Sequence, residues 1–531
     1  MAVFDPEQPY ATRRSPVVAR NLVATSQPLA AQAGVQALAR GGNAVDAALT
    51  AAITLTVVEP TGNGLGADAF ALVWDGGRLH GLNASGRAPA AWKPARFAKR
   101  AAMPELGPDS VTVPGAVSGW VALARRFARL PFADLFAPAI RYARDGFHVS
   151  PVIAALWGRA ADRLADQPGF ARTFLPAGRA PAVGELFRVP ALAATLEAIA
   201  ASEGATFYRG DVARATAAWV RRHGGGLTLA DLEAHRADWV EPLEHAAPGG
   251  RLAEIPPNGQ GIAAQIALGL LAHTALADHD PDGVAALHLQ IEAMKLAMAD
   301  LAAHVGDPGA MRLRPHDLLD ADYLAARARL IDPRHAGDPG AGAPRPGGTV
   351  YLTAADAGGM MVSFIQSNYM GFGSGVVVPE TGVSLQNRGA GFTLNAGHPN
   401  EVGPNKRPLH TIIPGFLRGD DGAPVMSFGV MGGPMQAQGH VQMVLRTQLW
   451  GQNPQAASDA PRWRVTGGRG VALETGFAPA VRAGLRARGH DVAVEPPDAA
   501  FAFGGAQLIA RLPDGYVAGS DGRKDGCALG F

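Results

Sequence analysis

Cysteine is almost absent from this 531-residue chain, in which Cys527 is the only one. A single cysteine excludes a disulfide within the chain and a metal cluster built from thiolates. A membrane-spanning run is missing too, because the most apolar stretch, Ala47 to Val58, is too short and contains threonines. The first twenty residues also lack the apolar core of a secretion signal. We therefore expect a cytoplasmic protein.

An excess of charge of one sign is missing as well, with 47 basic and 46 acidic residues. No net field draws such a chain to nucleic acid or to an anionic membrane, so we expect a small-molecule partner. Zincin, phosphate-loop and dinucleotide motifs are absent, and the 15 histidines are scattered. The sequence therefore predicts neither a metal nor an organic cofactor.

Helical patterns dominate the N-terminal two thirds. Gly41 and Gly42 break the chain, and Asn43 is placed to cap a helix over residues 44–58. Further helices are predicted at 29–38, 117–128, 191–201, 261–275 and 285–304. Two strands, at 69–74 and 79–84, are joined by an Asp-Gly-Gly turn.

A connector rich in glycine and proline, residues 331–348, separates this region from a strand-rich C-terminal third. Its composition predicts a flexible segment. Further strands are predicted at 349–355, 360–366, 424–428, 471–475, 491–494, 506–512 and 515–519, and helices at 438–450 and 479–488. Helices mixed with strands, without a repeat of fixed period, predict a layered α+β core.

Thr349 stands where the connector meets a strand. A threonine hydroxyl is a weak nucleophile unless a base lies beside it. A free α-amino group, with a pKa near ~7.7, is such a base when the threonine is the first residue of its chain. This chemistry requires cleavage of the bond between Gly348 and Thr349. The upstream connector would present that bond to the threonine hydroxyl.

Eight ordered motifs give the chain its strongest signal. They are GGNAVDAALTAAITLTVVEP (41–60), GNGLGADAFALVWDG (62–76), VTVPGAVSGW (111–120), LHLQIEAMKLAMAD (287–300), TVYLTAAD (349–356), FGSGVVVPETGVSLQN (372–387), GPNKRPLHTIIP (403–414) and GVMGGPMQAQG (429–439). With these motifs the chain resembles the γ-glutamyltranspeptidase family of N-terminal-nucleophile hydrolases over nearly its whole length.

The resemblance implies a four-layer αββα sandwich built by both chains of a cleaved precursor. The large α chain would be residues 1–348 and the small β chain residues 349–531, together forming one structural unit. Whether two such heterodimers pair further stays open.

The resemblance also assigns roles near the nucleophile. Thr349 would be nucleophile and, through its amine, base. Gly432 and Gly433 fall where the family places the N–H groups that bind the oxyanion, a role that suits glycine. Thr353 lies on the same strand face and is a candidate for orienting the terminus. Ser367 stands at the position of a family threonine that hydrogen-bonds the nucleophile.

Departures from the family pattern bear on the substrate. Ser85 replaces the arginine that holds a γ-glutamyl carboxylate, and Ala390-Gly391 replace the acidic pair that holds its amino group. Tyr369 replaces an asparagine that contacts the donor, and His410-Thr411 replace a serine pair. The chain is most similar to the branch that contains oxamate amidohydrolase and lidless γ-glutamyltransferase-like proteins, through the segments SGRAP, GADAF, SFIQSNYMGFGSG and LQNRG. Oxamate has a carboxylate beside a primary amide and no amino group.

A carboxylate substrate needs a cation. Arg87 and Arg388 are the candidates, because an arginine offers a two-pronged contact to a carboxylate. Asp68 is placed to pair with either of them. The sequence therefore favours hydrolysis of a small carboxylate-bearing amide, with oxamate first, through a threonine acyl-enzyme.

Three alternatives stay open. One is γ-glutamyl transfer or glutathione hydrolysis, and another is hydrolysis of a bulky acyl amide. The third is a binding protein that is neither cleaved nor catalytic, since Val350 and Tyr351 replace the residues usual just after the nucleophile.

Overall fold

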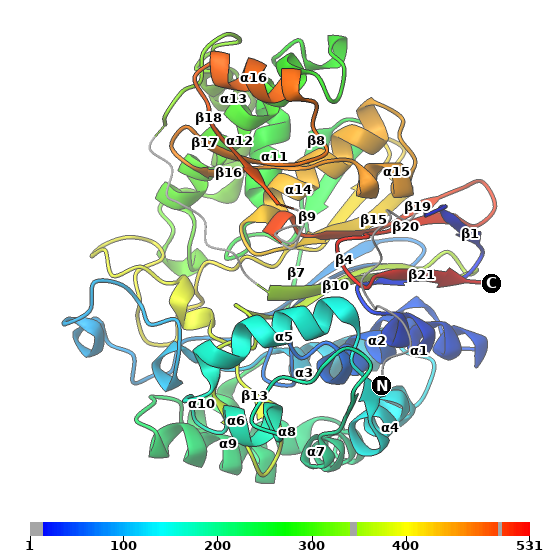
Figure 1. The fold of residues 1–531 in the computed structure, drawn as a ribbon, viewed down its shortest axis with the longest axis vertical. Coiled ribbons are helices and arrows are strands. Elements are labelled where there is room, and N and C mark those ends of the chain that lie inside the picture. The colour runs from blue at the N-terminus through cyan, green and yellow to red at the C-terminus, as the bar shows by residue number, and fades with distance from the viewer. Residues whose placement is uncertain (1–13, 340–347, 497–501) are drawn as a thin grey trace.

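The computed structural model describes residues 14–339, 348–496 and 502–531. Within these residues two seven-stranded sheets lie face to face, and helices cover both outer faces (Figure 1). This four-layer αββα arrangement confirms the predicted fold class. Across the described ranges, no helix combines the length and the apolar character that crossing a membrane would take.

The first sheet carries Thr349 at its centre. Its order is β21 (Cys527–Gly530), β2 (Leu22–Thr25), β10 (Gly348–Ala355), β11 (Met361–Tyr369), β3 (Asp68–Trp74), β4 (Leu79–Ala84) and β7 (Asp238–Val240). Neighbouring strands run antiparallel. Strands from the N-terminal and C-terminal parts of the sequence are therefore hydrogen-bonded neighbours in one sheet.

The second sheet has the order β1 (Val17–Ala19), β20 (Tyr516–Ser520), β19 (Gly505–Arg511), β15 (Pro424–Met431), β14 (Gly415–Arg418), β9 (Gly250–Glu254) and β8 (Leu243–Ala247). A third, smaller sheet joins β16 (Trp463–Gly467), β17 (Gly470–Glu474) and β18 (Asp491–Glu495), and short pairs join β5 (Phe147–His148) to β6 (Leu186–Phe187) and β12 (Val377–Val378) to β13 (Val383–Ser384).

The helices form two separate layers. Against the first sheet lie α1 (Pro28–Ala39), α2 (Ala44–Val58), α3 (Ala116–Phe127), α4 (Ala137–Asp145), α5 (Pro151–Leu164), α6 (Phe170–Phe174), α7 (Pro190–Ala201), α8 (Ala205–Arg209), α9 (Asp211–Arg222) and α10 (Leu229–Ala234). The other layer holds α11 (Gly261–Leu271), α12 (Val284–His304), α13 (Ala321–Ala328), α14 (Met435–Val444), α15 (Pro454–Asp459) and α16 (Pro479–Ala487). Figure 1 shows the first set below the sheets and the second above them.

Three apolar cores separate the four layers. A core of residues such as Phe70, Tyr351 and Phe416 lies between the two sheets. One larger core joins the first sheet to its helices, and another joins the second sheet to α11, α12 and α14. Packing against a core on both faces of each sheet holds the strands in register. A slip of one residue would move every side chain of a strand to the opposite face and out of the core in which it packs.

Helix α2 shows how local sequence fixes the scaffold under Thr349. The Asn43 side chain accepts hydrogen bonds from the N–H groups of residues 45 and 46, and Asp46 returns a bond to the Asn43 N–H. Asp356, in the turn after β10, accepts a bond from the Ala44 N–H at 2.8 Å. All fifteen residues of α2 are buried. The helix is thus fixed at its N-terminus to the turn that follows the strand carrying Thr349.

The predicted elements are confirmed, and the differences lie at their ends. The helix expected over 261–275 stops at Leu271, and the one expected over 438–450 starts at Met435 and widens into a π-helix at Leu445–Leu449. Residues 331–339 of the connector form neither helix nor strand, and the rest of the predicted flexible segment, 340–347, lies outside the described residues.

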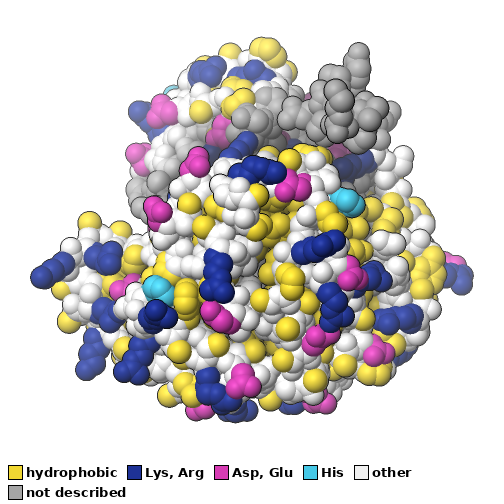
Figure 2. All heavy atoms as spheres, turned by 60° about the horizontal axis from the view of Figure 1, so that its bottom comes forward, with side chains coloured by type: hydrophobic (Ala, Val, Ile, Leu, Met, Phe, Trp, Pro, Cys, Tyr) yellow, Lys and Arg dark blue, Asp and Glu magenta, His cyan; other side chains and the backbone are white. Residues whose placement is uncertain are grey.

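One face of the molecule carries both signs of charge. In Figure 2 the basic and acidic side chains on this face are scattered among each other and are not gathered by sign. The described side chains on this face therefore form no continuous basic surface of the kind that follows a nucleic-acid backbone.

Candidate active site

Thr349 is the second residue of β10, a strand flanked by β2 and β11. The pairing of β10 with β11 shifts register between Gly348 and Val350, so Thr349 occupies an irregularity in the ladder. Such bulges re-aim side chains and are common beside active sites. The threonine is 1% exposed. Its hydroxyl is therefore held by protein groups in a largely dry environment.

Two side chains contact the Thr349 hydroxyl. Its Oγ1 lies 3.1 Å from Oγ of Ser367, and the amide of Gln436 donates to it at 3.4 Å. Ser367 in turn accepts a hydrogen bond from the Tyr369 N–H at 2.8 Å. Strand β11 and the first turn of α14 thus position the hydroxyl from two sides.

The Gly432-Gly433 turn joins β15 to α14. Both glycines have positive φ, +131° and +61°, which side chains with a Cβ rarely adopt. The Gln260 amide donates to the carbonyl of Gly433 at 2.9 Å and to that of Thr411 at 2.5 Å, which fixes the turn. Because Gln436 lies three residues after Gly433, the turn lies beside Thr349. Backbone N–H groups at the start of a helix suit an oxyanion.

Thr353 has a different partner. Its Oγ1 lies 2.6 Å from Oγ of Ser427 on β15, a strand of the facing sheet. This bond ties β10 to the second sheet at a buried position. Thr353 therefore aligns the strand that carries Thr349.

Arg388, Tyr369 and Thr411 lie together. Arg388 is 1% exposed, and its Nη1 donates to Oγ1 of Thr411 at 2.7 Å. The Tyr369 ring covers the guanidinium face, with the Arg388 Cζ 4.5 Å from the ring centroid. The buried Nε and Nη2 of Arg388 have no hydrogen-bond acceptor among the described residues. Burial lowers the pKa of Arg388 to about 10, against the opposing field of Asp68.

Asp68 and His410 form the neighbouring polar pair. Oδ1 of Asp68 accepts bonds from the N–H groups of Gly86 and Gly115 at 3.0 and 3.1 Å. Its Oδ2 lies 3.0 Å from Nε2 of His410, whose Nδ1 accepts from the Ile412 N–H. His410 is therefore neutral with its proton on Nε2, and burial holds its pKa well below the ordinary value. Burial raises the pKa of Asp68 to about 7, although Arg388 opposes the shift.

Arg87 lies apart from this group. Its side chain is 46% exposed and reaches Asp238 at 3.7 Å and the Asn405 carbonyl at 3.3 Å. Ser85, two residues before Arg87, is buried, and its hydroxyl forms hydrogen bonds with the side chains of Asn83 and Asn258. The structure thus gathers Thr349, Ser367, Gln436, Tyr369, Arg388 and Thr411 through shared contacts and leaves Arg87 at the surface.

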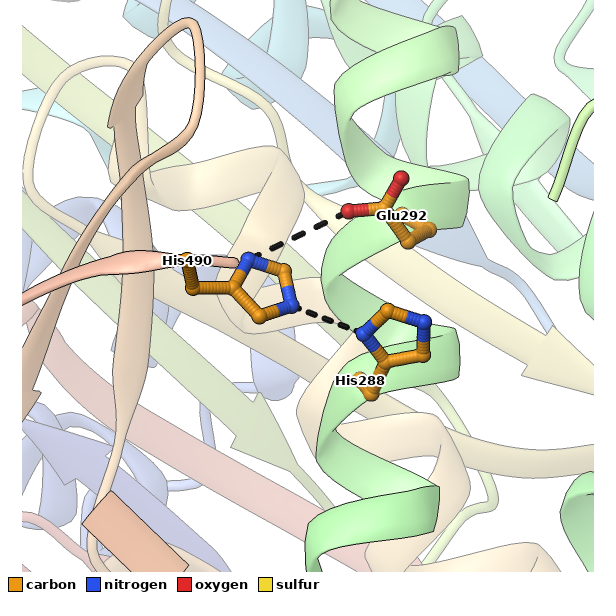
Figure 3. A group of neighbouring side chains, drawn as sticks. All are labelled: His288, Glu292 and His490. Atoms are coloured by element: carbon orange, nitrogen blue, oxygen red, sulfur yellow. Dashed lines mark hydrogen bonds and ion pairs between the residues drawn. The ribbon is translucent and has the colours of Figure 1, made fainter. Parts of the chain in front are cut away.

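A second buried polar group lies on α12. His288 and Glu292 project from this helix toward His490, which precedes β18 (Figure 3), and their ligand atoms all lie within 4.8 Å of one another. Such spacing is compatible with a metal ion. The Lys295 ammonium, however, donates to Glu292 at 2.9 Å and lies 3.5 Å from Nδ1 of His490. A divalent cation would meet that positive charge at close range.

The ring nitrogens of His288 and His490 all have hydrogen-bond partners within the protein. The Asp332 carbonyl only accepts, so Nε2 of His288 carries a proton and donates to it at 2.8 Å. Nδ1 of His288 then accepts from Nε2 of His490 at 2.8 Å. Burial lowers the pKa of both histidines, that of His490 to about 3, which agrees with neutral rings. Hydrogen bonds thus link Lys295 to the Asp332 carbonyl through both imidazoles.

Two residues of the site were not singled out from the sequence. Gln436 lies within the GGPMQAQG motif, three residues past the glycine pair, and Gln260 lies just before α11. Glutamine directly before or just inside a helix carries no local signal of function. Only the tertiary contacts with Thr349 and Gly433 identify them.

The sequence around this site, and most of the chain, is similar to known proteins. The family model described as Gamma-glutamyltranspeptidase matches residues 30–531. The oxamate amidohydrolase proenzyme of Klebsiella pneumoniae subsp. pneumoniae is 40% identical over 517 residues, covering 95% of this chain and 97% of that protein. A glutathione hydrolase-like YwrD proenzyme of Bacillus subtilis is 34% identical, covering 98% and 100%.

A solved structure shares the whole fold. The crystal structure of cephalosporin acylase from Bacillus halodurans superposes with a TM-score of 0.95 at 46% sequence identity, covering 100% of this chain and 99% of that one. The similarity thus extends from the motifs around Thr349 to all four layers.

Proposed function

The chain belongs to the gamma-glutamyltranspeptidase family, and on that premise we propose that it is an amide hydrolase with Thr349 as its nucleophile. The observation that carries this proposal is the buried Thr349 hydroxyl at the strand bulge, in contact with Ser367 and Gln436 and beside the Gly432-Gly433 turn. These are the parts that acyl transfer needs: an oriented nucleophile and donors for the oxyanion.

Maturation is the first step of the proposed mechanism. The Thr349 hydroxyl attacks the carbonyl carbon of Gly348, and the C–N bond between Gly348 and Thr349 breaks as the ester forms, which frees the Thr349 amine. Water then hydrolyses the ester, which leaves a carboxylate on Gly348 and restores the Thr349 hydroxyl. The α chain would then end at Gly348 and the β chain would begin at Thr349. The relatives from Klebsiella and Bacillus subtilis are both named proenzymes.

Turnover uses the same hydroxyl. Its proton passes to the Thr349 amine as Oγ1 attacks the substrate amide carbon, and the N–H groups of Gly432 and Gly433 stabilise the oxyanion. The ammonium returns a proton to the departing amine, which leaves an acyl ester on Thr349. Water then hydrolyses this ester and regenerates the hydroxyl. Ser367 orients the nucleophile, and Thr353 aligns its strand.

The proposed substrate is a small amide that carries a carboxylate, with oxamate as first choice and oxalate and ammonia as products. The 40% identical relative is named for oxamate. Ala390 and Gly391 provide no acid for an amino group, which disfavours γ-glutamyl donors. A bulky acyl amide is the second candidate, because the 46% identical structure is that of a cephalosporin acylase.

Mass spectrometry under denaturing conditions tests the nucleophile. Scaling the 54.8 kDa chain by length gives cleavage fragments of about 36 and about 19 kDa, the smaller beginning Thr-Val-Tyr-Leu. Thr349→Ser keeps a hydroxyl and should still cleave, whereas Thr349→Ala should remain one chain without activity. A single chain in wild type, or hydrolysis by Thr349→Ala, would refute the mechanism. The first result would favour an uncleaved binding protein.

Product analysis of the matured enzyme tests the substrate. Ammonia release from oxamate should far exceed glutamate release from glutathione. The reverse ratio would assign the protein to γ-glutamyl chemistry. Turnover of a bulky acyl amide alone would assign it to the acylases.

A further inference from the structure

Arg388 is a buried cation in which two of the three guanidinium nitrogens have no acceptor among the described residues. Nη1 donates to Thr411, while Nε and Nη2 donate to no acceptor in the described chain. Leaving charged donors buried and unpaired is costly, so proteins rarely keep such an arrangement without a ligand for it. The side chain is 1% exposed, which makes the arrangement a built feature and not a loose surface arginine.

The unmatched donors lie on one edge of the guanidinium plane. An Nε–Nη2 edge presents two parallel N–H groups whose spacing matches the two oxygens of a carboxylate. The Tyr369 ring, 4.5 Å from Cζ, fixes the tilt of the plane, and Thr411 fixes its rotation. The edge is therefore preorganised for a planar anion.

The acid that would neutralise Arg388 is engaged elsewhere. Asp68 accepts bonds from two backbone N–H groups and contacts His410. No ion pair joins Asp68 to Arg388 among those found in the described residues; the two act on each other only through their fields. An incoming carboxylate would thus find the edge open to direct contact.

The edge is also close to the nucleophile. Tyr369 pairs with Gly348 across β10 and β11, and its N–H donates to the serine that contacts Thr349. Tyr369 thus contacts the Arg388 guanidinium with its ring and pairs through its backbone with the residue before Thr349. This arrangement favours a short substrate whose carboxylate lies near the amide.

We propose that the Nε–Nη2 edge of Arg388 binds the substrate carboxylate and thereby makes the enzyme specific for short anionic amides. This assignment rests on the proposed function. It also disfavours γ-glutamyl donors, because the ammonium of such a donor would lie near Arg388 with no acidic partner at residues 390–391.

Oxamate and oxamide form a matched probe pair, since they differ only by an O⁻ replaced with NH₂. Arg388→Gln should lower kcat/KM for oxamate by about 100-fold or more while changing that for oxamide less than about threefold. Arg87→Gln, at the exposed arginine, should change neither. Equal losses with both amides in Arg388→Gln, or a selective oxamate loss in Arg87→Gln, would overturn the assignment.

Calorimetry separates this inference from the proposed reaction. Oxalate, the dianionic product, should bind the mature wild-type protein and bind Arg388→Gln at least about tenfold more weakly. This result would support the anion site even if no amide were hydrolysed. Absence of oxalate and oxamate binding to wild type would overturn it. If Arg388→Gln does not mature, Thr411→Val keeps the charge and should still lower oxamate turnover relative to oxamide; equal effects would again refute the site.

Discussion

Two buried arginines, Arg388 and Arg462, differ in what surrounds them. Arg462 donates to the carboxylate of Asp521 at 2.5 Å and to the carbonyls of Ser458 and Phe503, both at 3.1 Å. Arg388 has one neutral acceptor, Thr411, and a tyrosine face. Both are essentially without solvent exposure. Among the described residues Arg462 thus leaves only Nε without an acceptor and is paired with a carboxylate, whereas Arg388 leaves the whole Nε–Nη2 edge without an acceptor and forms no ion pair.

The carboxylates beside these arginines shift in opposite directions. Burial alone would raise the pKa of Asp521, but Arg462 and Arg523 reverse this and lower it to about 2. Burial raises the pKa of Asp68 to about 7, because Arg388 acts on it only at a distance. Direct ion pairing therefore decides whether a buried acid is held ionised at neutral pH. The Asp521 group belongs to the scaffold, and the Asp68 group to the site.

Replacing each arginine in turn should give the largest difference between the two sites, measured as the change in the free energy of unfolding. Arg462→Met should destabilise the protein by about 3–5 kcal/mol, because it leaves Asp521 buried with a weakened counter-charge. Arg388→Met should change stability by less than about 1 kcal/mol, since relief of desolvation offsets the lost Thr411 bond. Urea unfolding of the two variants measures the difference. Equal destabilisation would mean that Arg388 is a structural residue after all.

Asp521 and Asp68 should make the stability of the protein depend on pH in opposite ways. The stabilising contribution of Asp521 is present above about pH 4 and is lost as the pH falls toward 2, because its native pKa lies below its unfolded one. Asp68 has the opposite pH dependence, because its native pKa lies above its unfolded one. Its contribution to the free energy of unfolding is fully present below about pH 4 and is lost as the pH rises toward 7.

Unfolding free energies of Asp521→Asn and Asp68→Asn between pH 2 and 8 test this assignment. The first variant should lose the acid slope of wild type, and the second should lose the decline between about pH 4 and pH 7. A slope that survives in both variants would assign the pH dependence to other buried acids.

The smallest expected effect concerns the aromatic face under Arg388. Tyr369→Leu removes a buried cation–π contact of about 1–2 kcal/mol, so KM for oxamate should rise about tenfold while kcat stays within about threefold. Steady-state kinetics on oxamate and oxamide would check this. A change in kcat alone would instead place Tyr369 in the orientation of Ser367 and Thr349.

Much of the fold was predictable because it is encoded locally. The Asn43 cap predicted the helix that the structure has as α2, and the Asp-Gly-Gly turn predicted the pairing of β3 with β4. Element ends were less predictable. The π-helix at Leu445–Leu449 depends on the packing and hydrogen bonding of one turn, to which no residue type is specific.

The candidate site was predictable where motifs carry it and not elsewhere. Thr349, Ser367 and the glycine pair were named from motifs, and the structure brings them together. Arg87 and Arg388 were equivalent in sequence, because nothing local distinguishes an exposed arginine from a buried one. Burial and the unmatched Nε–Nη2 edge distinguish them, and both arise from tertiary packing.

The strand order of the two main sheets has a consequence for a cleaved chain. Segments from before and after Thr349 are hydrogen-bonded neighbours in both sheets. In the first sheet β2 lies between β21 and β10, and β11 lies against β3; in the second sheet β1 pairs with β20 and β9 with β14. After a cut before Thr349, the two polypeptides would be interleaved and not merely docked. Neither could leave without opening backbone ladders in both sheets, so their dissociation and their unfolding would be a single event.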